Sequence, residues 1–146
     1  MSGKQIGEQM KKSIEVEIES QIKQVWNTWI TPKDITKWNV ASDEWCCPKA
    51  EINLVVGGQF NYRMEASDGS MGFDFEGEFT AINLYKSIHY KLEDSREVKV
   101  EFIEFKDGVK VVETFDAEDE NSGEQQRQGW LAILTNFKKH VETKNS

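Results

Sequence analysis

The most regular hydrophobic pattern of the chain lies in residues 125–141. Apolar residues recur there at intervals of three and four, which predicts one long amphipathic helix. After a series of strands, such a helix is expected to lie across a sheet and to leave a cavity between them. Its apolar stripe consists of Trp130, Ile133, Leu134, Phe137 and Val141, and its polar face includes Gln128, Asn136, Lys138 and Lys139.

The first part of the chain predicts one strand and two short helices. Residues 13–20 alternate between apolar and polar side chains, which is the pattern of a half-buried strand. Residues 22–30 repeat with helical spacing, and Thr31-Pro32 should end that helix because the residue before proline avoids the α region. A second short helix is predicted from Lys33 to about Trp38.

Residues 39–48 show no clear period, and we interpret them as a loop at the mouth of the fold. Six strands should follow, joined by turns at Gly57-Gly58, Asp68-Gly69 and Asp107-Gly108. Residues 116–124 are acidic and are expected to form a solvated linker into the last helix. The predicted strands are 51–56, 59–66, 71–81, 88–92, 98–102 and 109–115.

This order of elements predicts an α+β fold with an antiparallel sheet and all helices on its concave face. We expect one domain over residues 1–146, with an ordered core from about 13 to 143. At this point the chain resembles the activator-of-Hsp90-ATPase-homologue-like family of the START and polyketide-cyclase (SRPBCC) superfamily. The residues that carry the resemblance are Val25-Trp26, Trp29, Trp38, Gly57-Gly58, Asp68-Gly69, residues 75–79 (Phe-Glu-Gly-Glu-Phe), Gly129-Trp130, Leu134 and Phe137.

The resemblance implies a helix-grip (START-like) fold, in which a curved antiparallel sheet wraps around a long C-terminal helix and two short helices follow the first strand. It also implies a deep apolar cavity, which the superfamily uses for lipids, sterols, polyketides or other hydrophobic molecules. Relatives include cyclases, aromatases, carriers and sensors, and eukaryotic members stimulate a chaperone ATPase. No additional amino-terminal domain like that of the eukaryotic co-chaperones is expected here, which favours pocket binding over chaperone regulation.

Charge and composition exclude several classes of function. The 26 acidic and 18 basic side chains give a net charge of -8, which argues against nucleic-acid and anionic-membrane binding. No apolar run resembles a secretory signal or a membrane span, so we expect a cytoplasmic protein, as a monomer or weak dimer. The adjacent Cys46 and Cys47 match no disulfide or metal pattern, and no cofactor or metal is expected.

Glu113 is the strongest candidate for chemistry, because it interrupts the apolar row Val109, Val111 and Phe115 of the last strand and should therefore point toward the core. A buried carboxyl group has a raised pKa and could donate a proton or anchor a ligand hydroxyl. Alternatively, a bulge exposes Glu113, or it pairs with a cation such as Arg127. Glu104 has the same ambiguity near the end of its strand, where the register could shift. His89 and His140 are interpreted as surface residues.

The sequence therefore predicts noncovalent binding of a small hydrophobic or aromatic molecule, lipid or polyketide-like, in a cavity between sheet and last helix. The alternatives are a co-chaperone-like interaction module and, third, a cyclase or aromatase in which Glu113 and Tyr62 would be the catalytic residues. The mouth is predicted near residues 38–48, where Trp45 could also contribute. The expected ligand-binding residues are Trp38, Tyr62, Met64, Phe73, Phe75, Tyr90, Phe102, Glu113, Trp130, Leu134 and Phe137.

Overall fold

The computed structural model describes residues 11–93, 95–116 and 120–144, with the backbone alone for residues 120–123. In this part of the chain, seven strands form one antiparallel sheet in the order β1-β7-β6-β5-β4-β3-β2. The antiparallel sheet predicted from the sequence is confirmed. The strands are β1 (Lys11–Ile18), β2 (Trp45–Ile52), β3 (Gln59–Ala66), β4 (Gly72–Asn83), β5 (Ser87–Leu92), β6 (Glu97–Phe105) and β7 (Gly108–Asp116).

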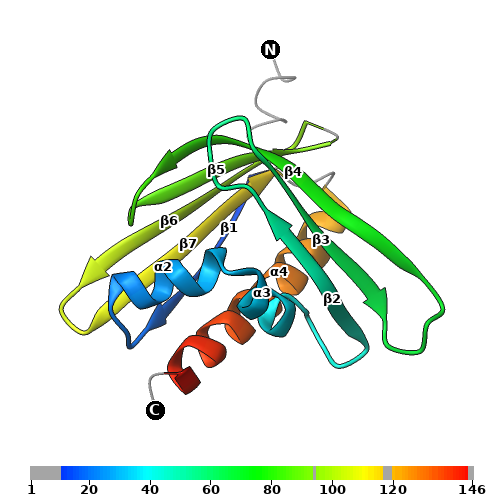
Figure 1. The fold of residues 1–146 in the computed structure, drawn as a ribbon, viewed down its shortest axis with the longest axis horizontal. Coiled ribbons are helices and arrows are strands. Elements are labelled where there is room, and N and C mark those ends of the chain that lie inside the picture. The colour runs from blue at the N-terminus through cyan, green and yellow to red at the C-terminus, as the bar shows by residue number, and fades with distance from the viewer. Residues whose placement is uncertain (1–10, 94, 117–119, 145–146) are drawn as a thin grey trace.

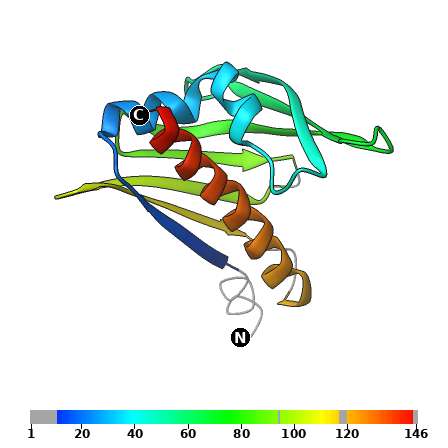
Figure 2. The same ribbon diagram turned by 90° about the horizontal axis from the view of Figure 1, so that it is seen from below.

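The described helices are α2 (Ile22–Ile30), α3 (Pro32–Trp38) and α4 (Glu120–Lys144), and they lie over one face of the curved sheet (Figure 1). Figure 2 shows α4 running obliquely along the sheet, and α4 contacts β1. The chain passes from β1 at one edge of the sheet to β2 at the other edge through α2 and α3. This arrangement confirms the predicted helix-grip architecture. No helix in the described part of the chain combines the length and apolar character needed to cross a membrane.

The residues that bury each element follow the predicted periodicity. In α4, Leu134, Phe137 and Val141 are fully buried, while Trp130 and Ile133 are partly buried against the same core. Because side chains alternate between the two faces of a strand, one face of each central strand packs under the helices. The buried side chains of the helices and of the strands form one hydrophobic cluster, which joins the helices to the sheet.

Two boundaries differ from the prediction. Strand β2 begins at Trp45 and ends at Ile52, so the predicted loop 39–48 contains its first half and the strand predicted at 51–56 lies too late. The pairing of β2 with β3 shifts register between Cys46 and Lys49, which hides the alternation that strand prediction needs. Pro48 is tolerated there because β2 is an edge strand.

Helix α4 begins at Glu120, so residues 120–124 belong to the helix and not to the predicted linker. Gly123 and the polar composition of this stretch concealed the helix in the sequence. An acidic residue such as Glu124 is nevertheless favourable near the start of the helix, where the helix dipole is positive. Residues 117–119 of the predicted linker lie outside the described residues.

Candidate functional site

A cavity of about 190 Å³ lies between the sheet and helices α2, α3 and α4. An engineered protein cavity of about 150 Å³ holds benzene, so this volume suits a small aromatic group. The wall is mainly aromatic, with a few polar groups among the rings. The lining residues are Trp29, Trp38, Asn39, Ile52, Phe60, Tyr62, Met64, Phe73, Phe75, Phe79, Ile88, Tyr90, Glu113, Trp130 and Ile133.

The structure brings most of the expected ligand-binding residues together on this wall. Phe102, Leu134 and Phe137 are different, because they are buried in the core and do not line the cavity. Helix α2 packs on two of these residues. The ring centroids of Trp26 and Phe102 are 5.2 Å apart, and those of Trp29 and Phe137 are 4.9 Å apart. The expected residues that do line the cavity are Trp38, Tyr62, Met64, Phe73, Phe75, Tyr90, Glu113 and Trp130.

The wall also contains residues that were not among the ligand-binding residues expected from the sequence. Phe60 shares the phase of Tyr62 on β3, and Ile88 shares the phase of Tyr90 on β5, so alternation was a usable signal for both. Contributions from α2, from the end of α3 and from the shifted strand β2 had no such signal. The additional lining residues are Trp29, Asn39, Ile52, Phe60, Phe79, Ile88 and Ile133.

Gly77 explains how the ring of Phe60 reaches its place. It pairs with Phe60 across the β3–β4 ladder, and a Cβ atom at Gly77 would lie 2.7 Å from that ring. Such a distance is too short for any side chain to be tolerated without movement. The absence of a side chain at Gly77 therefore lets the ring of Phe60 lie against β4 as part of the cavity wall.

Glu113 points inward, because β7 alternates between buried and half-buried positions without interruption. Its exposed fraction is 5%, and burial raises the pKa of its carboxyl group to about 8. Arg127, the cation considered from the sequence, instead bonds to the main-chain oxygen of Ser13 and lies near Glu124. Within the described residues, no protein group hydrogen-bonds to the Glu113 carboxyl.

Two buried tyrosines line the cavity near this carboxyl group. Burial raises the pKa of Tyr90, and the charge of Glu113 and then Tyr62 raise it further. The pKa of Tyr62 is raised by burial first and then by Cys47. Tyr90, which the sequence gave no catalytic role, is therefore the tyrosine whose pKa the charge of Glu113 raises, whereas Glu113 is not among the causes of the raised pKa of Tyr62.

Helix α3 is held in place by its side chains on the cavity wall. The indole Nε1 of Trp38 donates a hydrogen bond to the main-chain oxygen of Thr28 at 3.1 Å. The amide of Asn39 donates to the sulfur of Met64 at 3.4 Å, which joins the end of α3 to β3. These contacts fix two wall residues against two different elements.

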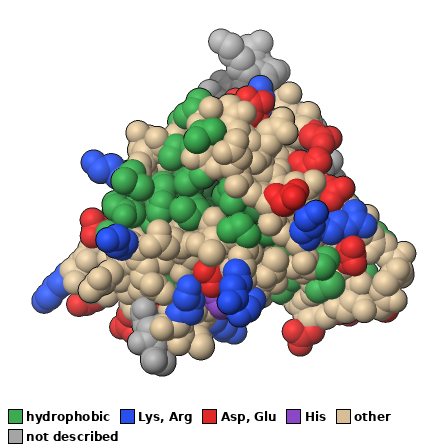
Figure 3. All heavy atoms as spheres, viewed as in Figure 1, with side chains coloured by type: hydrophobic (Ala, Val, Ile, Leu, Met, Phe, Trp, Pro, Cys, Tyr) green, Lys and Arg blue, Asp and Glu red, His purple; other side chains and the backbone are tan. Residues whose placement is uncertain are grey.

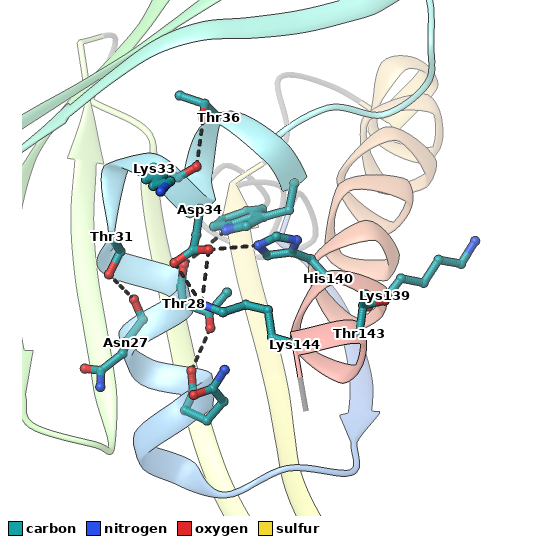
Figure 4. A network of polar contacts seen from close by, with 12 residues as sticks. Asn27, Thr28, Thr31, Lys33, Asp34, Thr36, Lys139, His140, Thr143 and Lys144 are labelled. Carbon is teal, nitrogen blue, oxygen red and sulfur yellow. Dashed lines mark hydrogen bonds and ion pairs between the residues drawn. The ribbon is translucent and has the colours of Figure 1, made fainter. Parts of the chain in front are cut away.

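A polar network on the outer side joins α3 to the end of α4 (Figure 4). Nε2 of His140 lies 2.9 Å from Oδ1 of Asp34, and Nζ of Lys144 donates to both carboxylate oxygens at 3.1 Å. Burial raises the pKa of Asp34, but the hydrogen bonds and charges of His140 and Lys144 outweigh it and leave this pKa lowered. His140 is thus half-buried in an ion-pair network and is not the isolated surface residue predicted from the sequence.

Glu104 lies away from the cavity. It continues the phase of Phe102, but it is exposed, as are Ile103 and Phe105 beside it. These exposed residues form the end of β6, beside the turn into β7, and Glu104 and Phe105 share a shallow surface hollow with the first residues of α2. His89 is half-buried on β5. Among the described residues, no group of histidine, cysteine or acidic side chains could hold a metal ion.

The exposed end of the cavity lies at β4 and α4. Phe73 is a wall residue that is 48% exposed, and the rings of Phe75 and Trp130 meet edge to face with centroids 6.2 Å apart. Of the predicted mouth, Trp38 and Asn39 line the cavity, whereas residues 40–48 do not. Trp45 instead packs against the exposed ring of Phe73, with ring centroids 5.7 Å apart. We therefore place the entrance beside Phe73, Phe75 and Trp130.

A family model described as "Activator of Hsp90 ATPase homolog 1-like protein" matches residues 19–142. The chain belongs to this family. The match spans every residue of the cavity wall, and in the network between α3 and α4 it includes Asp34 and His140 but not Lys144. In general terms, membership supports a ligand-binding or co-chaperone-like module.

Two solved structures show the same architecture at substantial sequence identity. An AHSA1-like protein from Aeromonas hydrophila is 45% identical, with a TM-score of 0.87 over 93% of this chain and 94% of that chain. A protein from Cytophaga hutchinsonii is 40% identical, with a TM-score of 0.80 over 92% and 93%. A Nitrosomonas europaea protein with a TM-score of 0.80 is only 15% identical, covers 93% of this chain and 96% of that chain, and shows the fold alone. No functionally curated protein matches the chain.

Proposed function

We propose that this member of the activator-homologue family binds a small hydrophobic or aromatic molecule noncovalently in the cavity between sheet and α4. The observation that carries the proposal is an aromatic cavity of about 190 Å³ with a buried carboxyl group on its wall. Burial of apolar ligand surface contributes about 25 cal/mol per Å² before the costs of ordering are subtracted. A lipid or polyketide-like molecule is the class that this wall favours, and action in the cytoplasm as a monomer or weak dimer belongs to the same proposal.

Polar groups at a few positions of an apolar pocket fix the orientation of a ligand. Glu113, Tyr90 and Tyr62 supply a carboxyl group and two hydroxyls on a mainly apolar wall. Each is buried, so a hydrogen bond to the ligand would form away from competing water. This arrangement supports recognition of one polar group on a mainly apolar molecule.

An amide-resolved NMR titration with fatty acids, sterols and small aromatic compounds tests the proposal. Saturable shifts should cluster around Tyr62, Phe75 and Trp130. Replacing Ile133 by Phe, which adds a ring to the wall, should weaken binding at least about tenfold because overfilled sites cannot relax freely. Leu131→Phe is the matched control on α4, because Leu131 is also partly buried but does not line the cavity. Absence of saturable shifts with every compound would contradict the proposal.

A co-chaperone-like interaction module is the second candidate, and exposed apolar side chains favour it. Val55 and Val56 in the β2–β3 connection and Leu84 after β4 are each more than half exposed. Hydrophobic side chains also gather between α2 and β5 on the helix-bearing face (Figure 3). Such surface is typical of protein contacts when it forms a continuous patch. This function predicts stimulation of a chaperone ATPase that Val56→Lys reduces and Ile133→Phe leaves unchanged.

A cyclase or aromatase is the third candidate, favoured by the raised pKa of Glu113 beside the Tyr90 hydroxyl. A carboxyl group that keeps its proton near neutral pH can act as a general acid. This function predicts that Glu113→Gln abolishes turnover of a bound polyketide-like compound while leaving its binding largely intact. Equal turnover by the variant would remove this candidate.

A further inference from the structure

The cavity combines many aromatic rings with a single acidic group. Nine of its fifteen lining residues are Trp, Phe or Tyr, and Glu113 is the acidic residue among them. The faces of aromatic rings attract cations, most strongly where water is excluded. No Lys, Arg or His lines the wall, so the described cavity offers the carboxyl group no cation of its own.

A buried carboxyl group needs a partner, because an unmet polar group in an apolar site costs free energy. Within the described residues, the structure supplies no hydrogen bond to Glu113. A ligand nitrogen would supply one. A ligand amine is protonated at neutral pH, so on binding the carboxyl group would release its proton to solvent, and the ammonium and the carboxylate would form a pair with no net charge. Such a pair can enter an apolar cavity at a lower cost than a lone charge.

Resting on the ligand-binding function proposed above, we propose that the preferred ligand class is a hydrophobic amine whose nitrogen pairs with Glu113 while its apolar part lies against the aromatic wall. The other titratable side chains on this wall, Tyr62 and Tyr90, carry hydroxyls that accept or donate a further hydrogen bond. The net charge of -8 also favours the approach of a cation over that of an anion.

Other polar ligands fit this wall less well. A carboxylate ligand would have to take up a proton or face Glu113 as a like charge. An alcohol would pair with the carboxyl group through an uncharged hydrogen bond, which is weaker than a charge-assisted one. A hydrocarbon would leave the carboxyl group without a partner. The expected order of affinity is therefore amine, alcohol, hydrocarbon and carboxylate.

Three probes of equal size test this order: 2-phenylethylamine, 2-phenylethanol and propylbenzene, with 3-phenylpropanoate as the anionic probe. Affinities are measured at pH 7 by NMR titration of the whole protein. The amine should bind at least about tenfold more tightly than the alcohol or the hydrocarbon, as expected for a charge-assisted bond. At saturation the side-chain carboxyl carbon of Glu113 should move to its ionised shift with the amine alone.

Two variants separate the carboxyl group from the rest of the wall. Glu113→Gln should abolish the advantage of the amine and leave propylbenzene bound. Glu104→Gln removes an exposed carboxylate from neighbouring β6 and should change no affinity. The carboxyl-carbon shift in the unaltered protein decides the question even if Glu113→Gln folds poorly.

The two proposals fail in different ways. If propylbenzene binds but the amine gains nothing, or keeps its advantage in Glu113→Gln, the amine proposal is overturned and the cavity function stands. If the alcohol binds most tightly, the amine proposal is likewise overturned and the cavity function stands. If none of the probes binds, both proposals are overturned.

Discussion

The indole of Trp130 on α4 stacks on the ring of Phe115 on β7, with centroids 4.3 Å apart and planes inclined by 15°. The edge contact with Phe75 lies at 6.2 Å and 82°, so this indole contacts both the core and the exposed end of the cavity. Phe115 is 1% exposed and follows Glu113 by two positions on the same face of β7. The stack therefore holds α4 beside the carboxyl group.

Replacing Trp130 by Ala should lower the free energy of unfolding by about 2–4 kcal/mol, because it removes a large partly buried ring and its stacking contact. Trp130→Phe keeps a ring and should lose about half as much. Chemical denaturation followed by circular dichroism measures both. Gln128→Ala on the exposed face of α4 is the control and should stay within about 0.5 kcal/mol. An equally small loss for Trp130→Ala would show that the stack contributes little.

Glu113 should make stability fall as pH rises. Its folded-state pKa of about 8 lies above the ordinary 4.5, so between these values the folded state keeps a proton that the unfolded chain releases. Relative to Glu113→Gln, the unaltered protein should lose about 1.4 kcal/mol per pH unit from about pH 4.5 to about pH 8. Tyr62 and Tyr90, whose raised pKa values lie above this window, should not contribute.

Urea unfolding of the two proteins across this pH range measures the difference. Glu104→Gln, which alters an exposed carboxylate, should show no comparable trend. A difference between Glu113→Gln and the unaltered protein that does not change with pH would mean that the carboxyl group is ionised in the fold.

Phe75 should control the rate at which ligands enter and leave. Its ring meets Trp130 at the exposed end of the cavity, so Phe75→Ala should raise both the association and dissociation rates of propylbenzene several-fold. Affinity should change less than the rates, because Phe75 is one ring among many on the wall. NMR exchange spectroscopy measures these rates. Phe105→Ala, on the exposed end of β6, should leave them unchanged, and unchanged rates in Phe75→Ala would place the entrance elsewhere.

Asp34 should stabilise the contact between α3 and α4. Asp34→Asn removes the charge that His140 and Lys144 share and should cost about 1–3 kcal/mol at pH 7. Because the folded-state pKa of Asp34 is lowered, this stabilisation is present above its ordinary pKa of 3.8 and is lost as pH falls through the folded value. Thermal unfolding of the two proteins at a series of pH values from 7 downward measures the change. Asp43→Asn is the exposed control, and a loss that does not shrink anywhere below the ordinary pKa of 3.8 would contradict the ion-pair explanation.

The architecture could be predicted because hydrophobic periodicity and turn residues indicated the same elements over most of the chain. Residues 22–30 became α2 with the predicted end before Pro32, and residues 59–66 became β3 without change. The errors arose where local signals conflicted with tertiary context. The shifted register after Cys46 concealed the first half of β2, and glycine concealed the first turns of α4.

The site was predictable where a strand alternates regularly. Glu113 could be placed inward because β7 has no bulge, and Tyr62 and Tyr90 followed from the phase of their strands. Phe137 shows why the rest was not predictable. Its helical stripe fixed which face is buried, but only the packing of α2 decides whether a buried ring meets another ring or an open cavity.

The pairing of β1 with β7 joins residues that are far apart in the chain, as in the ion pair of Lys11 and Asp116 across 105 positions. During synthesis the β1–β7 ladder can therefore form only after β7 has been made. Contacts of this range slow folding, because a long loop must close before the pairing stabilises it. Until then β1 presents unpaired backbone groups, which expose the newly made chain to aggregation through this strand.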